Sequence, residues 1–223
     1  MTMKYIRARP YDYQFEPDKT AVMLVDFQKD FLYSGGFGES LGNDVSLLQR
    51  AVEPTKRVLK ASRDHGLQIF HVREGHKPDL SDCPISKRTR GNFEKRIGDV
   101  GQMGRILVRG EYGHRIIDEL APIDGEMIID KPGKSAFYKT NLAEELDQKG
   151  IRYLIFTGVT TEVCTLTTVA QANDHGYEVL TLEDCVGSYK PDLHEAALKM
   201  ITSQDGIFGW VTESKELLKS LIV

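Results

Sequence analysis

The sequence lacks long apolar runs and an excess of basic residues, and each absence excludes a class of protein. No stretch approaches the roughly 18 apolar residues of a membrane-spanning helix, and residues 1–10 lack the apolar block of a signal peptide. The formal net charge of −4 gives no basic footprint for nucleic acid or anionic lipid. The densest basic run, residues 87–90, is expected to be a solvated loop. We therefore expect a soluble, cytoplasmic protein that binds neither nucleic acid nor membrane.

Cysteine is also scarce. The three cysteines are Cys83, Cys164 and Cys185, an odd number with no paired spacing. This pattern favours neither a disulfide framework nor a zinc ribbon, so at least one thiol is expected to be free.

The length of the chain suits one domain. Its 223 residues, 40% of them hydrophobic, suffice for one well-buried core and are few for two domains of ordinary size. We expect a single domain over residues 1–223.

Short apolar runs typical of buried parallel strands alternate with amphipathic stretches. Strands are expected at residues 20–26, 67–72, 126–130, 153–157 and 178–182, with a weaker one at 206–211. Helices are expected at residues 45–65, 115–120, 141–149, 162–175, 193–203 and 214–221. The alternation predicts an α/β protein with a doubly wound parallel sheet, in the three-layer, Rossmann-like arrangement. Residues 74–112 show little periodicity, which predicts a functional loop or a subunit interface.

Three reactive side chains follow predicted strands. Asp26 closes the first strand, Lys131 follows the third, and Cys164 lies on the turn after the strand at 153–157. Ligands of such sheets bind outside the carboxyl ends of the strands. We therefore expect the acid, the amine and the thiol to meet at one edge of the sheet.

These three residue types suit nucleophilic catalysis on an amide carbonyl. A thiol attacks as its thiolate, and an ordinary cysteine has a pKa of about 8.5. We expect Cys164 to lie at a helix N-terminus, where unpaired N–H groups and the Lys131 ammonium would lower its pKa. Asp26 would accept the thiol proton and return it to the leaving amine, while the N–H groups hold the oxyanion. Such a site needs no metal and no cofactor.

Residue types alone leave alternatives open. A lone cysteine is usually a small buried hydrophobe, and Cys185, which also follows a strand, could claim the role of Cys164. Cys83 could do so with less support. An aspartate at a strand end often only stabilises a turn. Lys134, three residues after Lys131, could take the role of that lysine.

Three sequence blocks carry a family resemblance. Residues 25–31 read VDFQKDF, residues 130–137 read DKPGKSAF, and residues 157–164 read TGVTTEVC. Together and in this order they resemble the isochorismatase-like cysteine hydrolases, whose lysine and nucleophile segments are written K-P-x-x-S-A-F and T-G-x-x-T-x-x-C. The resemblance implies the isochorismatase-like hydrolase fold.

The resemblance also implies residue roles. It assigns the general base and acid to Asp26, thiolate stabilisation to Lys131, the nucleophile to Cys164, and the backbone oxyanion donors to Thr160 and Cys164. It favours Lys131 over Lys134, because the matching lysine directly precedes a proline. It further implies a cis peptide bond before Thr160 and a homotetramer.

Within this family the chain is similar to the biuret hydrolases, at residues 73–79 (REGHKPD), 104–107 (GRIL) and 130–134. This similarity implies cleavage of biuret to allophanate and ammonia through a thioester-type acyl-enzyme, with Phe31 and Gln204 binding the substrate. Biuret is planar and rich in donors and acceptors, so an aromatic ring and an amide suit it. Triuret, ureidoacrylate and N-carbamoyl amino acids carry a similar carbamoyl group and are alternative substrates.

Other interpretations are less well supported. Family members that hydrolyse the vinyl ether of isochorismate use no nucleophilic cysteine. Metal-assisted nicotinamidases carry Asp-x-His and a further histidine, an arrangement that His71 and His76 do not form. A catalytically silent binding scaffold would be favoured by loss of a reactive residue, but all three are present.

Overall fold

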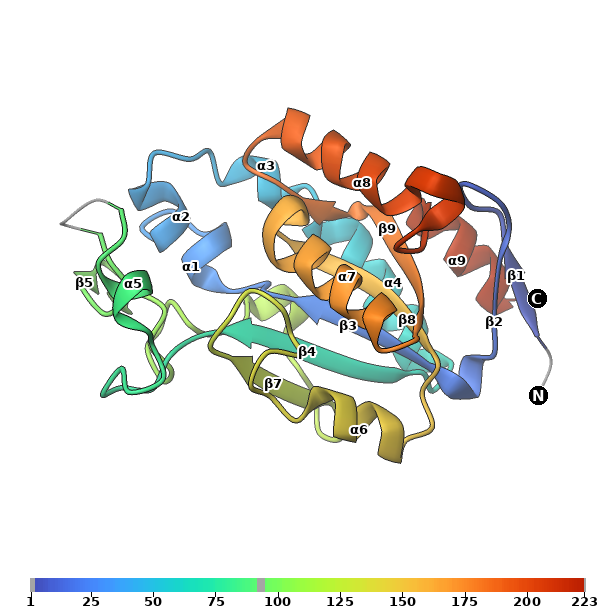
Figure 1. Cartoon of the computed structure of the whole chain (residues 1–223), viewed down its shortest axis with the longest axis horizontal. Coiled ribbons are helices and arrows are strands. Elements are labelled where there is room, and N and C mark those ends of the chain that lie inside the picture. The colour runs from blue at the N-terminus through green and yellow to red at the C-terminus, as the bar shows by residue number, and fades with distance from the viewer. Residues whose placement is uncertain (1–2, 92–94, 223) are drawn as a thin grey trace.

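A computed structural model, which describes residues 3–91 and 95–222, has a wholly parallel six-stranded sheet at its centre (Figure 1). The strand order is β10-β9-β8-β3-β4-β7. The strands are β3 (Thr20–Val25), β4 (Gln68–Glu74), β7 (Met127–Lys131), β8 (Tyr153–Val159), β9 (Glu178–Gly187) and β10 (Trp210–Thr212). All six expected strands are present, and the predicted fold class is confirmed.

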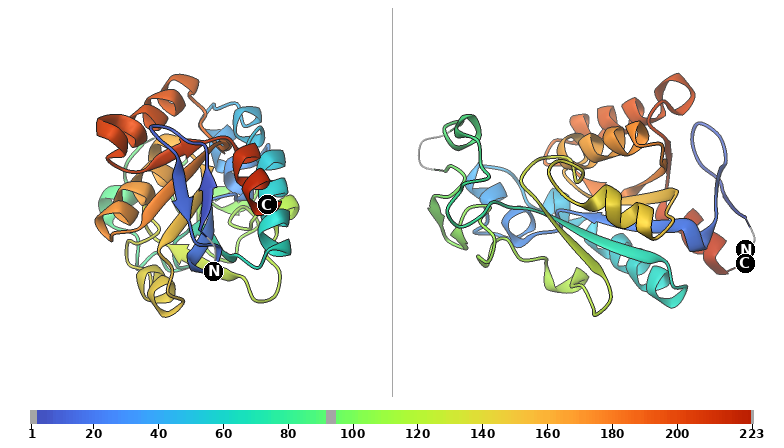
Figure 2. Two further views of the ribbon diagram at one scale, coloured as in Figure 1. Left: turned by 90° about the vertical axis from the view of Figure 1, so that its right-hand side faces the viewer. Right: turned by 60° about the horizontal axis from the view of Figure 1, so that its bottom comes forward.

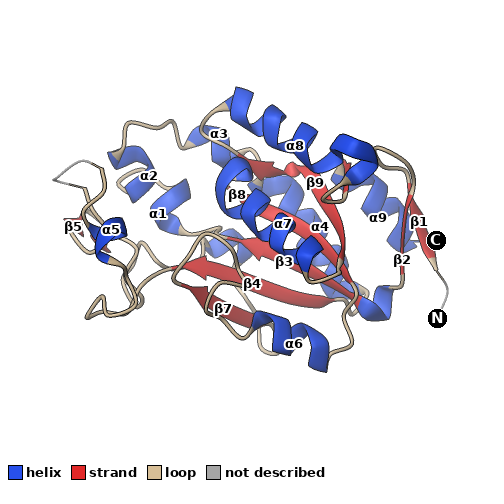
Figure 3. Ribbon diagram, viewed as in Figure 1, coloured by secondary structure: helices blue, strands red, loops and turns tan. Residues whose placement is uncertain are grey.

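Helices cover both faces of this sheet (Figures 2 and 3). Side chains of β3 alternate between the faces: Val22 and Leu24 pack into one apolar cluster, Met23 and Val25 into the other. Burial on both faces explains why the strands read as continuous apolar runs. The first cluster lies under α3 (Ser46–Gln49), α4 (Val52–Asp64) and α9 (Ser214–Ile222), and the second under α6 (Leu142–Gln148), α7 (Leu166–Asp174) and α8 (Pro191–Gly206).

Several helices differ from the sequence prediction. The single helix expected at 45–65 is divided into α3 and α4, and Pro54 lies in the first turn of α4, where its missing N–H costs no helical hydrogen bond. The helix expected at 115–120 is only a 3₁₀ turn, η2 (Asp118–Leu120). The helix expected at 162–175 begins with a π-helical turn, η3 (Thr161–Thr165), before α7.

Some elements carried no signal strong enough to predict them. They are short and depend on their neighbours: β1 (Lys4–Ile6), β2 (Tyr13–Phe15), η1 (Pro17–Lys19), α1 (Lys29–Leu32), α2 (Phe37–Ser40), α5 (Ile85–Arg88), β5 (Val100–Gly101) and β6 (Gly104–Arg105). Figure 1 shows α1, α2, α5 and β5 gathered at the end of the molecule toward which the arrows of β3 and β4 point. The described parts of the segment after β4, residues 75–91 and 95–112, therefore lie beyond the carboxyl edge of the sheet. In the described ranges, no helix is both long and apolar enough to cross a membrane.

Candidate active site

Four neighbouring strands bring the candidate residues to one edge of the sheet. The register pairs Val25 of β3 with Gly158 of β8 and with Val72 of β4. Asp26 is the residue directly after Val25. Strand β4 pairs with β7 so that Glu74 lies opposite Lys131. The chain that leaves β8 turns back through η3, which carries Cys164. The three predicted residues therefore meet, as the topology predicts.

Asp26 and Lys131 form a fully buried ion pair. Nζ of Lys131 lies 2.8 Å from Oδ2 of Asp26 and also donates to the carbonyl oxygen of Gly133 at 3.0 Å. The other carboxylate oxygen of Asp26, Oδ1, is buried and makes no hydrogen bond with the described residues. Asp26 adopts a φ of 56°, which is uncommon for a residue with a Cβ atom and directs the chain sharply out of β3. The thiol of Cys164 is the neighbouring group that can donate a hydrogen bond to this carboxylate.

Cys164 sits on a tight turn after β8. Thr160 precedes η3 in an extended conformation, and the Val159–Thr160 peptide bond is cis, as the resemblance implies. Gly158 lets β8 approach β3 closely, because a Cβ atom there would lie 2.5 Å from the carbonyl oxygen of Val25. The side chain of Thr161 is 2.9 Å from Nδ1 of His194, a contact that ties η3 to the first turn of α8. The turn that carries Cys164 is therefore held by β3 on one side and by α8 on the other.

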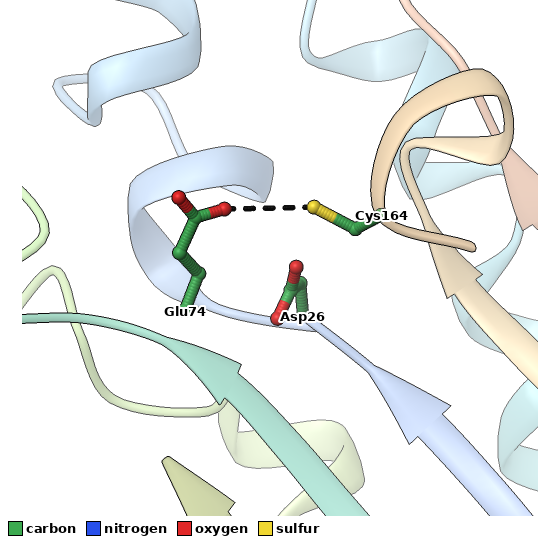
Figure 4. Close-up of side chains that lie close together, drawn as sticks. All are labelled: Asp26, Glu74 and Cys164. Atoms are coloured by element: carbon green, nitrogen blue, oxygen red, sulfur yellow. Dashed lines mark hydrogen bonds between the residues drawn. The ribbon is translucent and has the colours of Figure 1, made fainter. Parts of the chain in front are cut away.

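Glu74 is a fourth member of the site. Figure 4 shows its carboxylate to the left of the Cys164 sulfur and that of Asp26 below the sulfur, and Sγ lies 3.5 Å from Oε2 of Glu74. The backbone of Glu74 is fixed by the amide of Gln28, which donates to its carbonyl oxygen and accepts from its N–H. The sequence analysis missed this role, because it ended the strand at Val72. The only available signal was a charged residue directly after an apolar run.

Two lysines outside the predicted set also reach Glu74. Nζ of Lys134 lies 2.7 and 2.9 Å from the two carboxylate oxygens, and Nζ of Lys87 lies 3.7 Å from Oε1. Lys87 also donates to the carbonyl oxygen of Pro132 at 2.9 Å. The interpretation of residues 87–90 as only a solvated loop is therefore wrong at Lys87, since α5 turns this side chain inward.

The surroundings shift the pKa values of Asp26 and Glu74 in opposite directions. Burial raises the pKa of Asp26 from its ordinary value, and the charge of Glu74 adds to this, against the opposing effect of Lys131. Burial also opposes ionisation of Glu74, but the ammonium groups of Lys131, Lys134 and Lys87 outweigh it and hold the pKa of Glu74 at about 2. Of the two carboxylates, Asp26 is therefore the better proton acceptor.

The surroundings favour the protonated form of the thiol. Burial raises the pKa of Cys164 well above its ordinary value, and the charges of Asp26 and Glu74 add to this, although Lys131 and Lys134 oppose it. The sequence analysis expected a lowered pKa, and this expectation is corrected because it did not include the depth of burial. A thiol of this kind becomes a nucleophile only when a neighbouring base takes its proton.

A cation has little room here. Asp26, Glu74 and Cys164 are a group that could supply metal ligands, with ligand atoms within 4.8 Å of one another. The Lys131 ammonium lies 2.8 Å from Asp26 and 3.7 Å from Glu74, so it already supplies the positive charge that these carboxylates need. The residues present fit a thiol-based site better than a metal centre.

The two predicted substrate-binding residues, Phe31 and Gln204, are not part of this buried cluster. Phe31 is on α1, five residues after Asp26, and its partly buried ring packs against the core cluster that also holds Leu32. Gln204 is exposed at the far end of α8, with a φ of 51°, next to Gly206, which approaches Pro10. His194 marks the end of α8 that touches the site, and nine helical residues from it to Ser203 span roughly 13 Å. The structure therefore does not bring Gln204 to the Cys164 of its own chain.

The other two cysteines lie outside the site. Cys185 is on β9 and packs into the apolar cluster under α4 and α9. Cys83 belongs to a small apolar cluster with Leu80 and Val108 in the segment after β4. Neither thiol contacts a buried acid–lysine pair.

Comparisons with known protein families and sequences match most of the chain. Residues 20–216 match the family model described as the isochorismatase domain. A ureidoacrylate amidohydrolase RutB from Yersinia enterocolitica is 30% identical over 213 residues, covering 93% of this chain and 91% of that protein. A ureidoacrylate amidohydrolase RutB from Methylorubrum extorquens is 32% identical over 211 residues, covering 92% and 84% of the two chains.

Solved structures show the same fold. A cysteine hydrolase from Pseudomonas syringae superposes with a TM-score of 0.80 at 24% identity, over 100% of this chain and 99% of the other. An N-carbamoylsarcosine amidase from Thermoplasma acidophilum superposes with a TM-score of 0.68 at 25% identity, over 89% and 98% of the two chains. Three of these four proteins carry ureido or carbamoyl names, the fourth is named as a cysteine hydrolase, and none is named for biuret.

Proposed function

Because the chain belongs to the isochorismatase family, we propose that it is an amidohydrolase of small ureido compounds in which Cys164 is the nucleophile. One observation carries the proposal: a cysteine thiol lies with a buried carboxylate–lysine pair at the carboxyl edge of the sheet. That combination supplies a nucleophile, a base and a fixed positive charge in one water-poor place.

The first half of the reaction forms an acyl-enzyme. Asp26 takes the proton from Cys164 as Sγ attacks the carbonyl carbon of the substrate. The N–H groups of Thr160 and Cys164 hold the resulting oxyanion, and Lys131 keeps Asp26 oriented. The tetrahedral intermediate collapses when Asp26 returns the proton to the departing nitrogen, so the C–N bond breaks and an S-acyl cysteine remains.

The second half regenerates the thiol. Asp26 is again ionised and takes a proton from water, whose oxygen attacks the thioester carbonyl. The thiolate leaves and recovers the proton from Asp26, and the acid is released. Side chains and backbone of the chain perform each step, and we propose neither a metal nor a cofactor.

The substrate that we propose is a ureido acid such as ureidoacrylate. The relatives at 30% and 32% identity are named as ureidoacrylate amidohydrolases, and they cover most of both chains. They support this alternative better than biuret, which the motif similarity alone had favoured. Phe31, on the helix that follows Asp26, is the aromatic side chain that we propose to pack on the substrate.

We also propose a homotetramer in the cytoplasm, as the resemblance implies. Apolar side chains exposed on one stripe of α8, Leu193 and Met200, suit burial against another copy. Since Gln204 lies far from its own site, a role in substrate binding requires a second copy of the chain. We retain that role only together with the tetramer.

The test is hydrolysis of a substrate panel by the purified protein, Cys164→Ser, and Cys83→Ser as a matched control. The panel contains ureidoacrylate, N-carbamoylsarcosine, biuret, triuret and nicotinamide, with the release of ammonia and amine measured. Turnover of a ureido compound that is lost in Cys164→Ser and kept in Cys83→Ser supports the proposal. No turnover of any compound would favour a silent binding scaffold.

A further inference from the structure

Glu74 is a buried carboxylate for which the reaction above has no use. It is fully buried, its pKa of about 2 makes it a poor base, and Gln28 holds its backbone in place. Besides the Cys164 thiol at 3.5 Å, its carboxylate contacts lysines: Lys134 at 2.7 Å, and Lys87 and Lys131 at 3.7 Å each. A carboxylate in this setting positions cations.

Charges around the thiol do not balance. Asp82 pairs with Arg109, and Asp130 with Arg73 and His114, so these groups are neutralised elsewhere. Around the thiol, three ammonium groups face two carboxylates, which leaves one positive charge in excess; the members are Lys87, Lys131, Lys134, Asp26 and Glu74.

This excess persists during the reaction. When the proton moves from Cys164 to Asp26, it stays within the group, so the sum of charges is unchanged. Protonation of Asp26 from solvent only increases the excess. An excess of positive charge that solvent reaches only in part favours the binding of an anionic ligand there.

Lys134 is the cation that a ligand can reach. Its side chain is 44% exposed, whereas Lys131 is 0% and Lys87 24% exposed. Oε2 of Glu74 is 3.5 Å from Sγ of Cys164 and 2.9 Å from Nζ of Lys134. The distance from Sγ to this ammonium is therefore at most the sum of these two distances. A substrate whose carbonyl meets Sγ and whose carboxylate is a few bonds away can reach this ammonium.

We infer that Lys134, with Lys87 beside it, binds the carboxylate of the substrate, and that Glu74 holds the two ammonium groups for this purpose. The enzyme then discriminates by charge: it turns over a ureido acid more readily than a neutral ureido compound of the same shape. This inference rests on the proposed function and specifies its substrate class.

The test compares one anionic and one neutral substrate of nearly the same shape, 3-ureidopropionate and its methyl ester. The proteins are the full-length chain, Lys134→Gln, Lys87→Gln, and Lys77→Gln as a matched control. Lys77 is an exposed lysine of the same segment. Hydrolysis is followed by release of ammonia or amine, and KM and kcat are measured separately.

We expect the unchanged protein to prefer the anion by at least about tenfold in kcat/KM. Lys134→Gln should raise KM for 3-ureidopropionate about tenfold relative to KM for the ester, while any change in kcat should be the same for both substrates. Lys87→Gln should act in the same direction and Lys77→Gln should have no effect. Equal losses on both substrates, or no preference for the anion, would overturn the inference.

Binding separates this inference from the proposed function. In Cys164→Ser, which cannot form the acyl-enzyme, calorimetry should detect 3-ureidopropionate and show weaker binding after Lys134→Gln. Turnover of both substrates without charge preference leaves the nucleophile intact and removes only the inference. Absence of both turnover and binding removes both.

Discussion

Nζ of Lys131 lies 2.8 Å from Oδ2 of Asp26, and neither side chain is exposed to solvent. Burial alone would lower the pKa of Lys131, but Asp26, Cys164 and Glu74 raise it, so the lysine keeps its charge. The pair therefore places a permanent cation beside the base of the reaction. A buried pair of this kind is costly to break, since the remaining partner has no water to solvate it.

Removal of the cation should lower both stability and activity. In Lys131→Met, Asp26 and Glu74 lose their shared partner, and the free energy of unfolding in urea should fall by about 3–5 kcal/mol. The matched control is Lys60→Met at an exposed position of α4, where the pair of Lys60 with Asp64 should contribute less than about 0.5 kcal/mol. An unchanged stability of Lys131→Met would contradict the account of this pair.

The two carboxylates should respond differently to neutralisation. Asp26→Asn removes the proton acceptor, so kcat should fall about 10²–10⁴-fold. Glu74→Gln removes a group whose pKa of about 2 prevents it from acting as a base, so we expect its main effect on KM. Steady-state kinetics on the same substrate distinguish them. A larger loss of kcat in Glu74→Gln than in Asp26→Asn would reverse the assignment.

The acid limb of the pH–rate profile should report Asp26. The carboxylate must be ionised to take the thiol proton, so kcat/KM falls as pH decreases through its pKa. Because burial raises that pKa, the limb should lie above the ordinary value of 3.8. The profile is measured where circular dichroism shows the fold intact. A limb at or below 3.8 would mean that Asp26 is not the titrating base.

The assembly proposal has a simple readout. Light scattering behind size exclusion should give a mass of four 25.1 kDa chains. Leu193→Asp or Met200→Asp on the exposed stripe of α8 should lower that mass, since a charge in an apolar interface is disfavoured. A monomer mass for the unchanged protein at working concentration would sink the tetramer.

The positions of the strand ends explain why the meeting of the three reactive residues was predictable from the sequence. Asp26, Lys131 and Cys164 each follow an apolar strand, and parallel strands place their carboxyl ends at one edge whatever their order. The prediction therefore did not depend on the topology, which the sequence could not supply.

Long-range packing explains what was missed. Lys87 lies in a segment without periodicity, and only the position of α5 beyond the sheet reveals that it turns inward. The role of Glu74 required knowing that β4 continues past Val72. The raised pKa of the thiol depends on complete burial, which spacing and residue type do not report. Gln204 was placed by motif alone, and α8 carries it away from its own site.

The most direct test of the account is to trap the acyl-enzyme. The protein is quenched with acid during turnover of ureidoacrylate, digested, and analysed by mass spectrometry. The account predicts that the peptide containing Cys164 gains the mass of one acyl group derived from the substrate, while those containing Cys83 and Cys185 remain unmodified. An adduct on another cysteine, or turnover that persists after Cys164 is fully alkylated, would contradict it.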